Sequence, residues 1–149
     1  MELKIDIAST RMLDELFEIE QDCFDNEAFT KQQISYLLND VNTIALAAKS
    51  DSNVAGFVIA EIEMEENTEY GHIVTLNVAP KFRHKGVATL MLHEIESFLK
   101  QRSITQIRLE VREDNNPALK LYSKLGYEKI GKLDNYYGKK HGVYLKKNL

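Results

Sequence analysis

The sequence lacks the features typical of disulfide-rich, secreted or membrane-spanning proteins. It contains a single cysteine, Cys23, so no disulfide can form within the chain. It shows no signal peptide and no apolar run long enough to cross a bilayer. We therefore expect a cytoplasmic protein with no membrane partner.

Metal and dinucleotide motifs are also missing. The four histidines, His72, His84, His93 and His141, are not spaced as metal ligands are, so we expect no metal. No Gly-x-Gly-x-x-Gly follows the first expected strand, and no Gly-x-x-x-x-Gly-Lys-Ser/Thr occurs. These absences argue against a Rossmann dinucleotide domain and against a P-loop nucleotide site.

The charge balance argues against nucleic acid as a partner. The formal net charge is −4, and the dense basic stretches are residues 81–85 and 139–147. A nucleic-acid-binding protein is usually basic overall or carries a long basic stripe. The first of the two stretches is short, which suits a small polyanion better than a duplex. A negatively charged chain is also compatible with a cationic co-substrate such as an amine.

Size and composition predict one globular domain over residues 1–149. The fractions of apolar and charged residues, 44% and 28%, are those of an ordinary globular protein, and no repeat or Pro/Gly/Ser-rich linker divides the chain. A chain of this length buries about two thirds of its unfolded surface, which is enough for a core. Seven Tyr and six Phe, with no Trp, indicate aromatic walls as well as aliphatic packing.

Hydrophobic periodicity predicts the element order β-α-α-β-β-β-α-β-α-β-β. Three strands joined by short turns make an antiparallel meander, and a strand–helix–strand unit then gives one parallel pair. The fold class is therefore α/β (α+β), with a mixed, mostly antiparallel twisted sheet flanked by four helices. The expected strands cover residues 3–7, 43–49, 54–64, 70–78, 106–111, 127–133 and 142–146.

Capping residues mark the expected helices. The first is capped by Ser9 or Thr10, and the second begins at the Thr-x-x-Gln capping box of residues 30–33. The third covers 87–101, and the fourth begins with Asn116 as the cap and ends at Gly126. One stripe of the first helix faces the core: Leu13, Leu16, Phe17, Glu20 and Phe24.

The rest of the chain is organised around residues 77–89, where an apolar strand, a basic loop and an amphipathic helix follow one another. Backbone N–H groups at a helix N-terminus are unpaired and favour anions such as phosphate. The basic side chains of Lys81 to Lys85 flank this point, and Gly86 lets a phosphate approach the main chain closely. The plain alternative is a strand-to-helix turn with a solvated basic loop.

Two motifs in this order resemble the GNAT superfamily of acyl-CoA N-acyltransferases. Residues 83–88, Arg-His-Lys-Gly-Val-Ala, fit its Arg/Gln-x-x-Gly-x-Gly/Ala signature. Residues 115–127 match its Asn-x-x-Ala-x-x-Leu-Tyr-x-x-x-Gly-Phe/Tyr block. Residues 109–112, Leu-Glu-Val-Arg, and the Tyr136-Tyr137 pair resemble the RimI group within it, which acetylates protein N-termini. The predicted element order is also the order of this fold.

The resemblance implies an acetyl-CoA-dependent N-acetyltransferase that transfers the acetyl group directly, without an acyl-enzyme. The implied acceptor is the N-terminal α-amine of a protein or peptide. We expect a monomer or a homodimer. Acetylation of a small amine, a polyamine or a Lys side chain is an alternative. A non-catalytic acyl-CoA-binding protein is a further one, against which the presence of both Glu110 and Tyr122 speaks.

The resemblance also assigns roles in catalysis. Tyr122 becomes the general acid, although its place on a buried helix face would otherwise indicate a core aromatic. Proton transfer from a phenol of pKa about 10 to the thiolate of a thiol of pKa about 8.5 is uphill by about 2 kcal/mol. A hydrogen bond from the phenol to the leaving thiolate therefore helps even without full proton transfer. Glu110 becomes the general base, acting directly or through water. From the residues alone, Glu110 could equally be a solvated carboxylate on a strand.

The remaining site residues are assigned to acetyl-CoA and to the acceptor. Main chain near Val78 is expected to meet the thioester and the pantetheine arm if its strand splays from the parallel neighbour. Asn115 resembles the residue that hydrogen-bonds that arm, and Cys23 is expected to take no part. The expected cofactor-binding residues are Leu76, Asn77, Val78, Arg83, His84, Lys85, Gly86, Val87, Ala88, Thr89 and Asn115. The expected acceptor walls are Phe24, Phe29, Tyr136 and Tyr137.

Overall fold

A computed structural model describes residues 2–24, 27–137 and 140–149 of the chain. These residues form one sheet in the order β1-β2-β3-β4-β5-β7-β6, antiparallel except between β4 and β5. The predicted fold class and element order are confirmed. The strands are β1 (Lys4–Ile7), β2 (Thr43–Ser50), β3 (Asn53–Glu65), β4 (Thr68–Val78), β5 (Gln106–Arg112), β6 (Glu128–Tyr137) and β7 (Lys140–Asn148). The helices are α1 (Leu13–Phe24), α2 (Lys31–Asn39), α3 (Val87–Gln101) and α4 (Asn116–Lys124).

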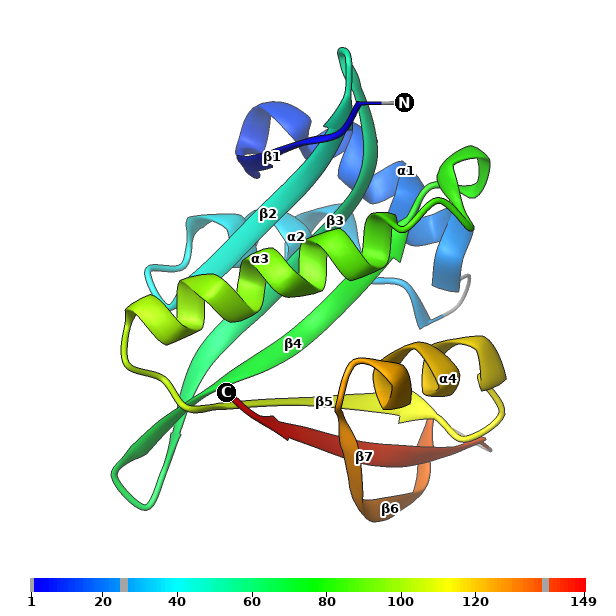
Figure 1. Cartoon of the computed structure of the whole chain (residues 1–149). Helices are drawn as coiled ribbons and strands as arrows, with labels where there is room; N and C mark the ends of the chain where they lie inside the picture. The colour runs from blue at the N-terminus through cyan, green and yellow to red at the C-terminus, as the bar shows by residue number, and fades with distance from the viewer. Residues whose placement is uncertain (1, 25–26, 138–139) are drawn as a thin grey trace.

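Helices cover both faces of the sheet (Figure 1). Side chains alternate along β3, so Phe57 and Ile59 face α1 and α2 while Val58 and Ala60 face α3. Each face therefore has its own buried apolar cluster. Among the described residues, no helix combines the length and apolar character needed to cross a bilayer.

Of the caps predicted for the first two helices, the structure shows the second and not the first. The predicted capping box is confirmed, since the Gln33 N–H donates to Thr30 Oγ1 at 3.1 Å and the Thr30 N–H donates to Gln33 Oε1 at 2.8 Å. The predicted cap of the first helix is wrong. A 3-10 turn, Thr10–Met12, precedes α1, and the Ser9 side chain makes no cap bond.

Two boundaries near the end of the chain also differ from the prediction. The cap of α4 is Asn115 and not Asn116, because the Ala118 N–H donates to Asn115 Oδ1 at 3.2 Å. Gly126 closes this helix with a φ of +95°, as predicted. β6 continues beyond residue 133 to Tyr137, since pairing with β7 resumes after a register shift. The tyrosine pair thus lies at a strand end rather than in a loop.

The parallel strands β4 and β5 pair along a short stretch and then separate. Their described partners are Gly71 with Ile107 and His72 with Arg108. Just beyond, Val74 is an extra residue in β4, because Ile73 and Thr75 face consecutive residues of β3. Such a bulge bends the strand that carries it, which accounts for the divergence of β4 from β5. The fold therefore opens a gap in the middle of its own sheet.

Candidate active site

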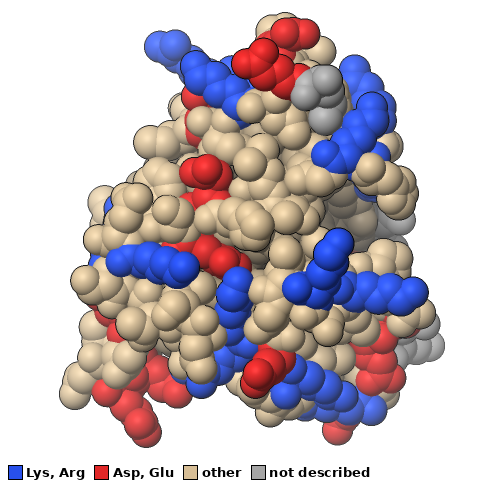
Figure 2. Space-filling view, in the orientation of Figure 1, with Lys and Arg blue, Asp and Glu red and all other residues tan. Residues whose placement is uncertain are grey.

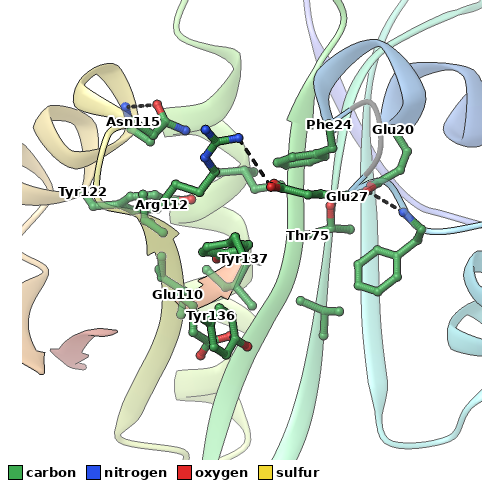
Figure 3. Close-up of a pocket in the computed structure, with 17 residues that line it drawn as sticks. Glu20, Phe24, Glu27, Thr75, Glu110, Arg112, Asn115, Tyr122, Tyr136 and Tyr137 are labelled. Carbon is green, nitrogen blue, oxygen red and sulfur yellow. Dashed lines mark hydrogen bonds and ion pairs between the residues drawn. The ribbon is translucent and has the colours of Figure 1, made fainter. Parts of the chain in front are cut away.

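The gap between β4 and β5 is a cavity of about 240 Å³ (Figure 3). The ends of α1, α4 and β6 complete its walls. It brings together residues that are far apart in the sequence. Those predicted from the sequence that line it are Phe24, Phe29, Leu76, Glu110, Asn115, Tyr122, Tyr136 and Tyr137.

The edge of β4 that faces this cavity presents main-chain groups. The Ala79 N–H bonds to the Ala55 carbonyl of β3 at 2.8 Å. Because bonding directions alternate along a strand, the N–H groups of Leu76 and Val78 point to the opposite edge, from which β5 has diverged. The Asn77 side chain points elsewhere, being 2% exposed and bonded to Glu20. By the same alternation the Asn77 main chain points toward β3, so of these three predicted residues Leu76 and Val78 present N–H groups to the cavity and Asn77 does not.

The basic loop before α3 lies outside the cavity and has left-handed backbone at two of its residues. His84 and Gly86 have φ values of +62° and +79°, and Lys85 between them is not left-handed. Alternation of this kind turns successive N–H groups toward one point, where anions bind. No side chain caps α3, and a Cβ at Gly86 would meet nothing within 4 Å. Lys and Arg side chains gather over this loop and again over α4 (Figure 2).

Arg83 and Cys23 meet at the carbonyl of Val78. Arg83 Nε donates to this oxygen at 3.3 Å, and Cys23 Sγ donates to it at 3.6 Å. Arg83 Nη2 also reaches Cys23 Sγ at 3.4 Å. Burial raises the pKa of the Cys23 thiol and outweighs the opposing effect of Arg83. A protonated thiol is a poor nucleophile, so the geometry gives no support for covalent catalysis by Cys23.

Tyr122 combines a buried position with a place at the cavity wall. It is 6% exposed, and its ring packs edge-on against Tyr127 with the centroids 5.4 Å apart. Tyr127 is fixed in turn, because its hydroxyl donates to Glu96 at 2.8 Å. Burial raises the pKa of Tyr122 well above its ordinary value of 10. Tyr122 therefore stays protonated and is suited to donating a hydrogen bond.

Glu110 is not a solvated strand carboxylate. Its neighbours Leu109 and Val111 are buried on the α3 side, so Glu110 points to the other face of the sheet. Its side chain is 15% exposed. The carboxylate accepts hydrogen bonds from His72 Nε2 at 2.8 Å and from the Tyr136 hydroxyl at 3.3 Å.

His72 is a site residue that the sequence did not reveal. Its Nδ1 lies 2.6 Å from Glu63 Oε2, and Tyr70 donates to the same carboxylate at 2.8 Å. Burial alone would lower the pKa of His72, but Glu110 and Glu63 together raise it to about 9. His72 is thus an imidazolium held between two carboxylates. Three strands supply these groups, so no local sequence signal marks them.

The His72 ion pairs predict a pH-dependent stability. The pKa of His72 rises from 6.5 to about 9 on folding, which corresponds to about 3 kcal/mol at most. A raised pKa stabilises the folded state fully below pH 6.5, and this contribution is lost as the pH rises through about 9. The stability advantage of the wild type over His72→Gln should therefore shrink across this window in urea unfolding. His93→Gln, an exposed histidine on α3, is the control, and an advantage independent of pH would contradict the assignment.

Glu20 is a second group whose role was not predicted, although its place on the core stripe was. It is 1% exposed and lines the cavity. Its carboxylate accepts from Thr75 Oγ1 at 2.7 Å, Asn77 Nδ2 at 2.9 Å and the Phe29 N–H at 3.1 Å. One buried carboxylate thereby ties α1, the diverging part of β4 and the wall residue Phe29 together.

Charged and aromatic side chains border the mouth of the cavity. Arg112 Nη1 at the end of β5 lies 3.4 Å from Glu27 Oε1, which joins the two sides of the gap (Figure 3). Arg112 is also held by Asp114 through two bonds of 3.0 and 2.9 Å. The rings of Tyr136 and Tyr137 pack edge-on with centroids 4.8 Å apart. The described residues contain no cluster of His, Cys, Asp or Glu that could hold a metal ion.

This geometry agrees with comparisons to known proteins. Residues 13–127 match the model of the acetyltransferase (GNAT) family. An N-alpha-acetyltransferase of Saccharolobus solfataricus is 33% identical over 104 residues, which cover 64% of this chain and 62% of that protein. The [ribosomal protein bS18]-alanine N-acetyltransferase of Salmonella typhimurium is 28% identical over 134 residues, covering 89% and 86%. The crystal structure of the ribosomal-protein-S18-alanine N-acetyltransferase from Escherichia coli superposes with a TM-score of 0.88, at 18% identity, covering 99% of this chain and 94% of that one.

The chain belongs to the acetyltransferase (GNAT) family. The family that the two sequence motifs indicated is thereby confirmed. The fold agrees too, since the superposition extends over nearly the whole chain.

Proposed function

We propose that this protein is an N-acetyltransferase that moves the acetyl group of acetyl-CoA directly to the N-terminal α-amine of a protein or peptide. One observation carries the proposal: the gap between β4 and β5 brings Glu110 and Tyr122 to the same cavity. The names of the Saccharolobus solfataricus and Salmonella typhimurium relatives support an α-amine as the acceptor.

The residues present fit acetyl-CoA, which supplies the activated acetyl group as a thioester. The N–H groups of residues 84–89 and the space above Gly86 suit its diphosphate. The main chain of Leu76 to Val78 suits the pantetheine arm and the thioester carbonyl. The cap of α4 uses Oδ1 of Asn115, which leaves its side-chain N–H groups for the same arm. Arg83 would exchange its bond to the Val78 carbonyl for the diphosphate.

Tyr122 acts as the donor to the sulfur that leaves. Its raised pKa makes complete proton transfer harder than for a free phenol, so a hydrogen bond to the developing thiolate is its main contribution. Removing one such preorganised donor typically costs about a hundredfold to a thousandfold in kcat.

Glu110 accepts the proton of the acceptor amine, directly or through a water molecule. Deprotonating an α-amine of pKa about 7.7–8.0 costs about 3.5 kcal/mol less at neutral pH than deprotonating a Lys amine of pKa about 10.4. A carboxylate base is thus better matched to an N-terminus. His72 and Tyr136 hold the Glu110 carboxylate from two sides and fix its orientation.

The acceptor is proposed to enter between the aromatic walls. Phe24 lines one side of the cavity, and Tyr136 and Tyr137 line the other (Figure 3). Phe29 also lines the cavity. A cytoplasmic location, a monomeric or homodimeric state and the absence of a nucleic-acid partner stay predictions.

A competition assay tests the proposed acceptor. The chain is mixed with acetyl-CoA and equal amounts of three acceptors: a peptide with a free N-terminus and no Lys, the same peptide with a blocked N-terminus and one Lys, and spermidine. Product mass spectrometry should show the first peptide as the main product. Preferred acetylation of spermidine or of the Lys peptide would contradict the proposal in favour of a small-amine or side-chain acetyltransferase.

A further inference from the structure

A row of side chains on β5 and β7 borders the acceptor side of the cavity, and this row has one gap. Glu110 pairs with Tyr144, and Arg112 pairs with Gly142. Directly paired residues of antiparallel strands share a face, so Gly142 lies beside Arg112 where a side chain would otherwise stand. The Tyr144 hydroxyl accepts a hydrogen bond from Arg108 Nη1 at 3.3 Å, so Tyr144 lies on the same face of the sheet as Arg108 and Glu110.

The tyrosine pair fills the gap that Gly142 leaves. A Cβ at position 142 would lie 3.2 Å from Tyr136 Cβ and 3.3 Å from both Tyr136 Cδ2 and Tyr137 Cε2. Carbon atoms seldom approach so closely, so the rings would have to move away by a few tenths of an ångström. The backbone itself does not require glycine here, because Gly142 is not among the residues with positive φ. The absence of a side chain at Gly142 therefore leaves room for the two tyrosine rings.

Both rings line the cavity that holds Glu110 and Tyr122. The Tyr136 hydroxyl donates to Glu110 at 3.3 Å, which is longer than the usual O–H···O hydrogen bond of about 2.5–3.0 Å. Tyr137 lines the same cavity as Tyr122, and its ring packs edge-on against Tyr136. A small displacement of the pair would break the bond to Glu110 and move one wall of the acceptor slot.

We propose that Gly142 is a positioning residue for the acceptor: its lack of a side chain sets where Tyr136 and Tyr137 lie against Glu110. The inference rests on the proposed function, since it assigns these tyrosines to the acceptor slot. Gly142 touches neither acetyl-CoA nor the acceptor in this account. It acts through the two rings that fold over it.

A variant at Gly142 should change the KM for the acceptor without lowering the stability of the fold. Glycine within a strand is destabilising, so alanine at a position of ordinary φ is neutral or stabilising for the fold. Gly142→Ala should keep the thermal midpoint of the wild type and raise the KM for the acceptor by about tenfold, since small misplacements of binding groups are costly. The KM for acetyl-CoA should not change. Gly142→Val should raise the acceptor KM further.

Gly131 on β6 provides a matched control. It lies on the same face, and a Cβ there would come no nearer than 4.0 Å to the Tyr144 side chain. Gly131→Ala should leave both KM values unchanged. An unchanged acceptor KM in folded Gly142→Ala, or an equal rise in Gly131→Ala, would overturn the inference.

A second readout does not depend on the acceptor. The ring resonances of ¹³C-labelled tyrosine in the purified protein report the edge-on pair directly. We expect those of Tyr136 and Tyr137 to shift in Gly142→Ala and to stay in place in Gly131→Ala. Unmoved resonances in Gly142→Ala would refute the positioning role even if the wild type acetylates a different amine. Absence of peptide acetylation by the wild type would instead refute the proposed function.

Discussion

Replacing Tyr122 by phenylalanine is expected to lower kcat by about a hundredfold to a thousandfold and to leave the Kd for acetyl-CoA nearly unchanged. The phenol is buried, lines the cavity opposite β4 and stays protonated because burial raises its pKa. Phenylalanine keeps the ring contact with Tyr127 and removes only the donor to the leaving sulfur. Steady-state kinetics together with calorimetric titration of acetyl-CoA measure the two quantities.

Tyr127 supplies the control for this experiment. It is a buried tyrosine in contact with Tyr122, but its hydroxyl donates to the buried Glu96 of α3 at 2.8 Å, and Tyr127 is not part of the cavity lining. Glu96 keeps a partner in Tyr127→Phe, because Lys147 Nζ lies 2.9 Å from it. This variant should lose some stability and little kcat. Weaker acetyl-CoA binding with unchanged kcat in Tyr122→Phe would argue against a donor role for Tyr122.

Replacing Gly86 by valine is expected to weaken acetyl-CoA binding by about tenfold or more, equivalent to at least about 1.4 kcal/mol. Gly86 has a φ of +79°, and a side chain there would extend into the open space in front of the α3 N-terminus. That space is where the diphosphate is proposed to bind. A β-branched residue would also strain the loop, since the left-handed region costs an L-residue about 1–2 kcal/mol.

A second glycine with a positive φ serves as a control, because replacing it causes backbone strain without touching the proposed acetyl-CoA site. Gly126 has a φ of +95° at the end of α4, and Lys147 is its nearest neighbour. Gly126→Val should lower stability as Gly86→Val does, without changing the Kd for acetyl-CoA. Alanine at the two positions gives the same comparison with less strain. A folded Gly86 variant that binds acetyl-CoA like the wild type would remove the diphosphate assignment.

The parts of the site that are contiguous in the sequence were predictable. The loop into α3 is one segment in which glycine, basic residues and a helix start follow one another, and α3 begins at Val87 as expected. The face that Glu110 presents follows from strand alternation alone. Both features depend on local spacing, which the sequence displays directly.

The polar partners of the site were not predictable, because strand register assembles them. Glu63 and His72 come together across β3 and β4, and Glu110 joins them from β5. The bulge at Val74 also resists prediction, since an apolar strand with one extra residue reads like any other. The ion pair between Glu27 and Arg112 joins residues that only the folded gap brings close.

Errors at element ends have a similar cause. Asn115 and Asn116 are equally good caps by residue type, and the backbone geometry of the turn after β5 selects the first. The end of β6 was missed because its pairing is interrupted after Leu133 and resumes at Tyr137. This interruption lets the tyrosine pair fold back over Gly142 toward Glu110.

A crystal structure of the chain with coenzyme A tests most directly whether the gap between β4 and β5 is an acetyl-CoA site. We predict that the diphosphate lies on the N–H groups of residues 84–89, that pantetheine runs along Leu76 to Val78, and that its sulfur lies within hydrogen-bonding distance of the Tyr122 hydroxyl. Coenzyme A bound elsewhere, with the loop amides already bonded to protein groups, would contradict the account.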